Sequence, residues 1–173
     1  MKISVFPILR KFINKKINWK DIEYFDDKWK LRIDKMSKYI ERNDSVMDLG
    51  CGKMWLKKHL HETNLYIPVD YKNRGEGTII CEFNKNEFPQ MHVDVTFVSG
   101  CLEYIKDYKW FISMIAEKSE RSIISYCTIE NFPDTHLRLK NAWENNLRRA
   151  DIISAYKSVG MSLIHEDITE TKN

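Results

Sequence analysis

Two glycines and a later carboxylate have the residue types and spacing to bind a nucleotide-like ligand. Gly50 and Gly52 follow an apolar run directly, so the backbone can turn sharply and a ligand can approach without meeting a side chain. Asp70 ends the next apolar run, where a carboxylate can accept hydrogen bonds from both hydroxyls of a ribose. The pattern of strand, glycine turn, helix, strand and terminal acid therefore predicts a ligand site over this turn.

The neighbouring residues narrow the choice of ligand. A dinucleotide fingerprint has a third glycine three residues after the second, where this chain has Trp55, and that side chain would obstruct a pyrophosphate. The sequence contains no Gly-x-x-x-x-Gly-Lys-Ser/Thr, which excludes a P-loop. The glycine turn fits neither of these phosphate-binding loops.

The elements that must position these residues alternate along the chain. Apolar and β-branched runs predict strands at Ser45–Leu49, Leu65–Val69, Thr78–Cys81, Val93–Val98, Ser122–Tyr126 and Met161–Asp167. Helical spacing predicts helices at 26–41, 54–62, 107–118 and 150–159, the last ended by Gly160, with a long loop or short helical insertion at 129–146. Because several strands are apolar without alternation, we expect an α/β fold with a mostly parallel sheet covered on two faces.

Composition bounds the class of protein. The 173 residues suit one domain, and 43% hydrophobic with 31% charged residues predicts a soluble globular protein. No apolar run approaches the roughly 20 residues of a membrane-spanning helix. A net charge of +3 without a basic stripe gives no reason to expect a nucleic-acid partner. The basic segment Met1–Trp19 could lie on an acidic membrane surface, but we favour packing on its own domain.

Four widely spaced cysteines indicate the compartment. Cys51, Cys81, Cys101 and Cys127 lie at or near the ends of predicted strands. This pattern favours reduced, buried thiols over a disulfide framework or a zinc site, so we expect a cytoplasmic protein without a metal.

The stretch Asp48-Leu49-Gly50-Cys51-Gly52 resembles the first motif of class I S-adenosylmethionine-dependent methyltransferases. Further motifs follow in the family's order over residues 45–168: Pro68-Val69-Asp70, Cys81-Glu82-Phe83, and the segment from Asp94 to Ile105. The resemblance implies a Rossmann-like, doubly wound sheet and S-adenosyl-L-methionine as cofactor. It implies that the cofactor-binding residues are Asp48, Gly50, Cys51, Gly52, Asp70, Tyr71, Glu82, Phe83, Ser99 and Gly100.

The resemblance also assigns roles within this set. Asp70 matches the acid that binds the ribose, and Glu82 matches the acid that contacts the adenine amino group. Tyr71 could stack on the adenine or cover the sheet edge. Met54 stands where the family usually has glycine, two residues after Gly52. The family ends in an antiparallel hairpin, and we expect that hairpin to be truncated or to lack its last strand here.

Two residues are candidates for moving a proton from an acceptor. His136 lies in the 129–146 insertion, where substrate-facing insertions often occur in this fold, and its imidazole suits general-base work. Glu103 follows the fourth predicted strand and could orient a substrate, act as a weak base or cap the 107–118 helix.

Together these features predict methyl transfer to a small-molecule or glycan acceptor. We expect residues 1–44 to be a helical lead-in or lid and residues 45–173 to be the cofactor-binding domain. No Asn/Asp-Pro-Pro-Tyr-type motif follows the fourth strand, which argues against DNA and protein-glutamine acceptors. The alternative is a methyltransferase-like binding or scaffold module without catalytic activity, which Met54 favours.

Overall fold

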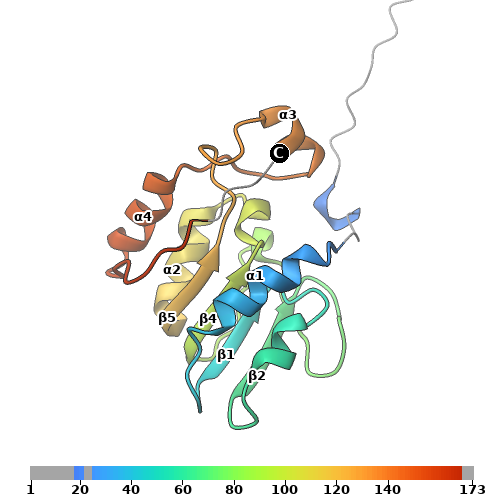
Figure 1. Cartoon of the computed structure of the whole chain (residues 1–173), viewed down its shortest axis with the longest axis vertical. Coiled ribbons are helices and arrows are strands. Elements are labelled where there is room, and N and C mark those ends of the chain that lie inside the picture. Colours follow the sequence, from blue (N-terminus) through green and yellow to red (C-terminus); the bar gives the residue numbers. More distant parts are fainter. Residues whose placement is uncertain (1–17, 22–24, 169–173) are drawn as a thin grey trace, which may run out of the picture.

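A single parallel sheet forms the centre of the molecule (Figure 1). The computed structural model describes residues 18–21 and 25–168. The strands lie in the order β3-β2-β1-β4-β5 and pair in parallel throughout. Their bounds are β1 (Ser45–Leu49), β2 (Leu65–Asp70), β3 (Ile79–Ile80), β4 (Val93–Ser99) and β5 (Ser119–Ser125). The order reverses between β1 and β4, and open α/β sheets bind ligands at such a reversal, beyond the carboxyl ends of the strands.

Helices cover both faces of this sheet, as the sequence predicts. The α-helices of the described residues are α1 (Lys28–Ser37), α2 (Tyr108–Lys118), α3 (Thr135–Lys140) and α4 (Arg149–Ser158). The 3-10 helices there are η1 (Trp19–Asp21), η2 (Trp55–His59), η3 (Phe83–Lys85) and η4 (Leu102–Tyr104). Residues of α1 and η2 pack on one face, and residues of α2 and α4 pack on the other.

The central strands are apolar on both sides because each face has its own core. Val46 and Phe97 face α1 and pack with Met36. Met47 on the opposite side belongs to a larger cluster with Phe111 of α2. Two-sided burial explains why β1 and β4 lack the alternation of a half-exposed strand.

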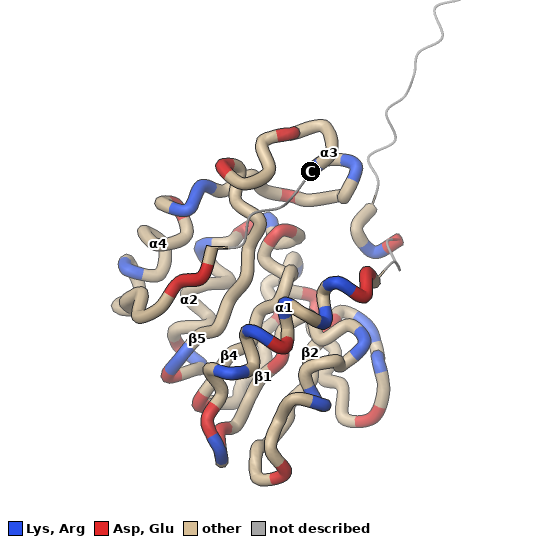
Figure 2. The backbone as a smooth tube through the Cα atoms, in the orientation of Figure 1, with Lys and Arg blue, Asp and Glu red and all other residues tan. Residues whose placement is uncertain are grey.

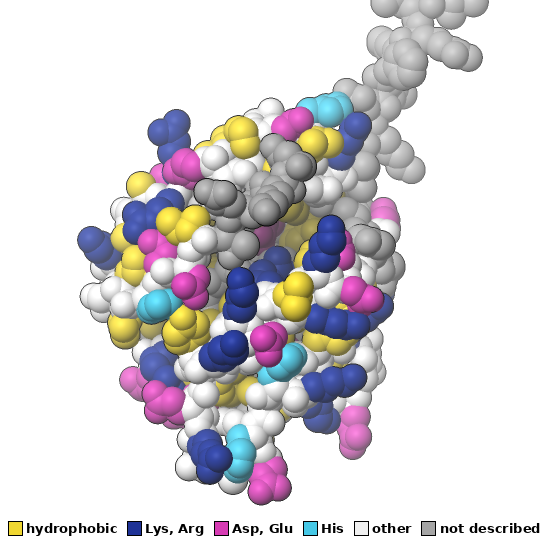
Figure 3. Space-filling model, in the orientation of Figure 1, with side chains coloured by type: hydrophobic (Ala, Val, Ile, Leu, Met, Phe, Trp, Pro, Cys, Tyr) yellow, Lys and Arg dark blue, Asp and Glu magenta, His cyan; other side chains and the backbone are white. Residues whose placement is uncertain are grey.

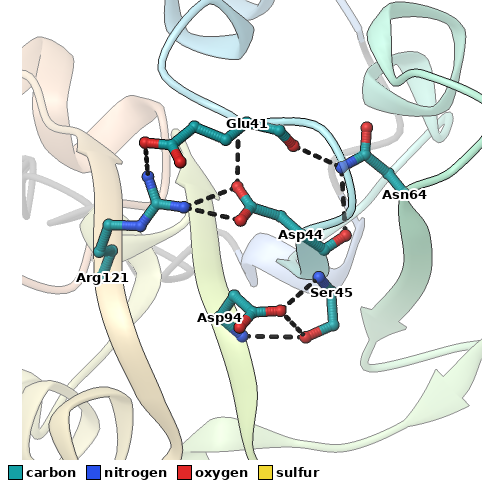
Figure 4. A network of polar contacts seen from close by, with 6 residues as sticks. All are labelled: Glu41, Asp44, Ser45, Asn64, Asp94 and Arg121. Carbon is teal, nitrogen blue, oxygen red and sulfur yellow. Dashed lines mark hydrogen bonds and ion pairs between the residues drawn. The ribbon is translucent and has the colours of Figure 1, made fainter.

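A polar network joins the amino ends of four strands (Figure 4). Nη2 of Arg121 on β5 donates to both carboxylate oxygens of Asp44 at 2.7 Å, and Nη1 donates to Glu41 at 3.1 Å. Asn64 donates to the carbonyl oxygens of Glu41 and Asp44 just before β2 begins. Asp94 of β4 accepts from both the amide and the hydroxyl of Ser45 at the start of β1. These bonds fix the strands at the edge opposite the predicted ligand site.

The prediction of a sixth strand at Met161–Asp167 is wrong. This segment has no regular secondary structure and pairs with no strand of the described chain. Arg149 of α4 pairs with Glu166, while the Tyr39 hydroxyl after α1 donates to Asp167, so the segment crosses toward α1 instead of following β5. Met161 packs against the core, but without strand partners Leu163 and Ile164 lie exposed, at 51% and 91%.

The predicted helix at 54–62 is also shorter than expected. Met54 has φ 53°, in the left-handed region, so it precedes the helix as its N-cap, and the five residues Trp55–His59 form the 3-10 helix η2. The insertion at 129–146, predicted to be a long loop or a short helical insertion, contains the short helix α3. Gly160 follows α4 with φ 83° and caps that helix as predicted. Expectations for residues 1–17 and for the C-terminal hairpin lie outside the described residues.

Candidate functional site

A cleft opens at the carboxyl ends of β1, β2 and β4, where the strand order reverses. It collects eight of the ten predicted cofactor-binding residues: Gly50, Cys51, Gly52, Asp70, Tyr71, Phe83, Ser99 and Gly100. These residues lie in four separate stretches of the sequence. The parallel sheet brings the stretches together because the carboxyl ends of its strands meet at one edge. The remaining lining residues are Trp19, Phe25, Trp29, Arg32, Ile33, Lys53, Trp55, Arg74, Asn84, Cys101, Tyr104 and Ile105.

The glycine turn is locked onto the end of β2. Gly50 and Cys51 both donate their amides to the carbonyl of Val69, at 2.8 and 3.0 Å. The Gly52 amide donates to Oδ2 of Asp70 at 3.0 Å. Gly50 and Gly52 have φ of 78° and 50°, which glycine adopts without strain. A Cβ on Gly50 would lie only 2.8 Å from Sγ of Cys101, so β4 also packs closely against the turn.

Asp70 is buried, and its carboxylate already has a cationic neighbour. Nε of Arg74 lies 3.1 Å from Oδ1 of Asp70. The Arg74 guanidinium also lies over the rings of Phe25 and Tyr71, at 5.5 and 5.2 Å from their centroids. Arg74 lies in the loop four residues after Asp70, and no sequence motif identifies it.

Met54 does not narrow the cleft. Its left-handed backbone explains why a glycine would suit this position. Its side chain points toward Gly75, where Cε would lie 3.4 Å from an added Cβ, and Met54 is absent from the cleft lining. The Met54 thioether therefore does not block a ligand from entering the cleft.

Aromatic residues before and within α1 form a wall of the cleft that the sequence analysis missed. Trp19 meets the ring of Tyr71 edge-on at 4.8 Å, and Phe25 packs against Trp29 and Trp55 at 6.0 and 6.1 Å. A Cβ on Gly52 would lie 2.6 Å from Cε1 of Phe25, so this ring covers the open side of the turn. No spacing rule ties these residues to the motif. Their aromatic character alone could have signalled them.

Two predicted cofactor residues lie outside the cleft lining. Asp48 is buried beneath the turn and accepts a hydrogen bond from the Tyr66 hydroxyl at 2.8 Å. Burial raises the pKa of the Asp48 carboxyl to about 7, and the charge of Asp70 adds to the effect. Glu82 forms ion pairs with Lys20 at 2.6 Å and Lys85 at 2.9 Å, and these hydrogen bonds lower its pKa.

The two predicted catalytic residues are not brought together in the cleft. His136 lies exposed on α3. Glu103 is buried in η4 between the lining residues Cys101 and Tyr104, and its Oε1 accepts from the Cys127 amide at 3.0 Å. Burial raises the pKa of the Glu103 carboxyl. Neither residue lines the cleft.

A buried arginine organises the insertion that carries His136. Arg138 is 1% exposed and donates to Asn146 at 2.6 Å and to the carbonyl of Cys127 at 3.0 Å. Its guanidinium lies 4.6 Å from the ring centroid of Trp143. These contacts make Arg138 a structural centre of the 129–146 insertion.

Lys, Arg, Asp and Glu residues are mixed along α1 and on the molecular surface around it (Figures 2 and 3).

In the part of the chain that the structure describes, no helix is long and apolar enough to cross a membrane. The same residues contain no group of three or more His, Cys, Asp or Glu side chains arranged to hold a metal ion.

The arrangement resembles methyltransferases of known structure. A chain in the complex between the Haloferax volcanii Trm112 methyltransferase activator and a candidate methyltransferase is 16% identical, with a TM-score of 0.61 over 83% of this chain and 80% of that chain. The Burkholderia thailandensis 1,6-didemethyltoxoflavin-N1-methyltransferase, with its substrate and S-adenosylhomocysteine bound, is 14% identical, with a TM-score of 0.59 over 81% of this chain and 70% of that one.

A third similar structure is CalO1, a methyltransferase in calicheamicin biosynthesis with S-adenosylhomocysteine bound. It is 11% identical, with a TM-score of 0.59 over 79% of this chain and 49% of that chain, so the match spans about half of its length. No protein-family model and no curated protein sequence matches this chain. The structural likenesses show that the chain has the fold of class I S-adenosylmethionine-dependent methyltransferases.

Proposed function

We propose that this protein transfers a methyl group from S-adenosyl-L-methionine to a small-molecule or glycan acceptor. The observation that carries the proposal is the position of Asp70. Its buried carboxylate ends β2 beside the glycine turn, at the strand-order reversal of a methyltransferase fold. Two similar structures have S-adenosylhomocysteine bound.

Each part of the cleft has a role in this proposal. Asp70 accepts hydrogen bonds from the ribose hydroxyls, while Tyr71 and Phe83 contact the adenine. The Gly50–Gly52 turn and the residues at the carboxyl end of β4, Ser99 and Gly100, bind the amino-acid end. The bound cofactor supplies an activated methyl group on a sulfonium. An acceptor held in line can attack that methyl, leaving S-adenosylhomocysteine.

The protein's contribution is then mainly orientation. Holding donor and acceptor in a reactive geometry can supply roughly 7–11 kcal/mol of the barrier. The aromatic wall of Trp19, Phe25 and Trp29 would exclude water and pack against a flat acceptor. These residues belong to the predicted lead-in at 1–44, which we propose acts as a lid over the domain at 45–173.

An alcohol acceptor would also need a base, and we propose His136 or Glu103 for this role. Glu103 directly precedes the cleft-lining Tyr104, and burial raises its pKa, which makes its carboxylate a stronger base. His136 lies on an exposed helix and would have to approach the cleft with α3. We further propose that the protein works in the cytoplasm, where thiols stay reduced, because its four cysteines are free.

A binding module without catalytic activity is the second candidate. The pairing of Asp70 with Arg74 and the position of Phe25 over Gly52 favour it, because both occupy space that a cofactor needs. Titration with S-adenosylmethionine and S-adenosylhomocysteine separates the candidates. Heat on mixing and a raised melting temperature support the enzyme. If millimolar ligand produces neither heat on mixing nor a raised melting temperature, cofactor-dependent methyl transfer is ruled out.

A further inference from the structure

Arg32 of α1 places a guanidinium at the end of the cleft away from Asp70. Its Nε donates to the Ser99 hydroxyl at 3.0 Å, at the end of β4. A Cβ on Gly100 would lie 2.6 Å from Nη2, so the guanidinium lies against the backbone just after that strand. Arg32 lines the cleft together with Ser99, Gly100 and Tyr104.

The two terminal nitrogens of Arg32 are not used within the described residues. Across 18–21 and 25–168, the Arg32 side chain has one hydrogen bond, through Nε, and one ring contact, with Trp29 at 5.6 Å. No carboxylate of those residues lies within ion-pair distance of it. Nη1 and Nη2 therefore face the cleft with donor capacity to spare.

The charge of Arg32 is also poorly compensated. Burial lowers its pKa, and Glu103, the acid whose charge opposes this shift, has a raised pKa of its own. Oε1 of Glu103 accepts from the Cys127 amide, and its buried Oε2 has no hydrogen-bond partner among the described residues, so Glu103 does not pair directly with Arg32. A cation withdrawn from water without a counter-ion is costly, and an anionic ligand would relieve that cost.

The position of this cation relative to Asp70 suggests which anion it receives. If the ribose lies on Asp70, an elongated adenosyl ligand crosses the Gly50–Gly52 turn and ends near Ser99 and Gly100. The amino-acid end of the cofactor carries one carboxylate. A guanidinium with two unused nitrogens can bind a carboxylate through two parallel hydrogen bonds.

We propose that Arg32 binds the carboxylate at the amino-acid end of the adenosyl cofactor. This inference rests on the proposed function of the cleft and adds a residue outside all the sequence motifs. It makes Arg32 a binding residue that fixes the direction of the cofactor and couples α1 to its presence.

The test compares two ligands that differ only in this carboxylate. Affinities for S-adenosylhomocysteine and for its decarboxylated analogue, which keeps the amine, are measured by calorimetry. Wild type should prefer S-adenosylhomocysteine by roughly tenfold or more, as expected for a charge-assisted pair. Arg32→Gln should weaken S-adenosylhomocysteine by a similar factor and leave the analogue within about twofold. Arg32→Lys should lose only part of the preference, because it keeps the charge.

Arg74→Gln is the matched control, since it removes a guanidinium at the ribose end, which both ligands share. It should shift both affinities by the same factor. Equal effects of Arg32→Gln on the two ligands, or no effect on either, would overturn the assignment of Arg32. A wild-type protein that binds neither ligand would instead overturn the proposed function and the assignment with it. If circular dichroism shows that Arg32→Gln does not fold, Arg32→Lys is used instead. The assignment is contradicted if Arg32→Lys prefers S-adenosylhomocysteine over the analogue as strongly as wild type does.

Discussion

The carboxylate of Asp70 lies 3.1 Å from Nε of Arg74, so the residue expected to hold a ribose is already paired with a cation. Its other oxygen accepts the Gly52 amide. A ribose must therefore share or replace the contact with Arg74, and the affinity of the cleft depends on the strength of this pair.

Replacing Arg74 should strengthen cofactor binding. Arg74→Gln removes the competing cation and leaves Asp70 free to accept ribose hydroxyls. We expect S-adenosylhomocysteine to bind several-fold more tightly, which corresponds to about 1 kcal/mol. Calorimetry measures the change. Weaker binding would mean that Arg74 supports Asp70 or contacts the ligand itself.

Removing the ring of Phe25 should speed cofactor association. This ring covers the open side of Gly52, so a ligand that approaches the turn has to displace it. Phe25→Ala is expected to raise the association rate of S-adenosylhomocysteine several-fold in stopped-flow measurements. Leu31→Ala is the control, because Leu31 lies on α1 but is 67% exposed. Equal association rates in wild type and Phe25→Ala would show that Phe25 does not obstruct the cleft.

The buried carboxyl of Asp48 should make stability fall as the pH rises. Burial raises its pKa to about 7, against about 3.9 in an unfolded chain. Between these values the folded state keeps a proton that the unfolded chain has lost, so the free energy of unfolding falls with increasing pH. Asp48→Asn removes this dependence while keeping an acceptor for Tyr66.

Urea unfolding at pH 5 and pH 8 measures the effect of Asp48. The free energy of unfolding of Asp48→Asn minus that of wild type should be about 2–3 kcal/mol larger at pH 8 than at pH 5. A constant difference would mean that Asp48 is ionised throughout in the folded protein.

The network around Arg121 should contribute measurably to stability. Arg121→Gln leaves the buried carboxylate of Asp44 without its two hydrogen bonds from Nη2. We expect a loss of about 1.5–3 kcal/mol in the free energy of unfolding. The exposed Arg42, two residues before Asp44, provides the control, and Arg42→Gln should change stability by less than about 0.5 kcal/mol. Similar losses in both variants would assign no special role to the network.

Local patterns predicted the sheet well because its central strands are apolar on both faces. Val46 and Met47 lie on opposite sides of β1 and are both fully buried. A strand buried on both faces appears in the sequence as a continuous apolar run, which a local pattern detects. The strand expected at Met161–Asp167 failed for the opposite reason. Its apolar residues suit a strand, but pairing depends on a neighbour that a local pattern does not reveal.

The site was predictable where a backbone motif defines it. Gly50 and Gly52 form a turn that is hydrogen-bonded to Asp70 at the end of β2, and the spacing of these three residues in the sequence carries the signal. Arg32 and Phe25 reach the same cleft only through the packing of the N-terminal segment on the sheet, so no spacing rule finds them. No sequence pattern distinguishes Arg138 from an exposed cation, and only the fold shows that its guanidinium donates to the carbonyl groups of Cys127 and Phe132.

The central claim is that Asp70 holds the ribose of an adenosyl cofactor, and one titration tests it most directly. S-adenosylhomocysteine is titrated into wild type and into Asp70→Asn, which keeps an acceptor for the Gly52 amide but loses the charge. The account predicts saturable binding to wild type and at least roughly tenfold weaker binding to a folded Asp70→Asn. Equal affinities in the two proteins, or no binding to wild type at millimolar ligand, would contradict it.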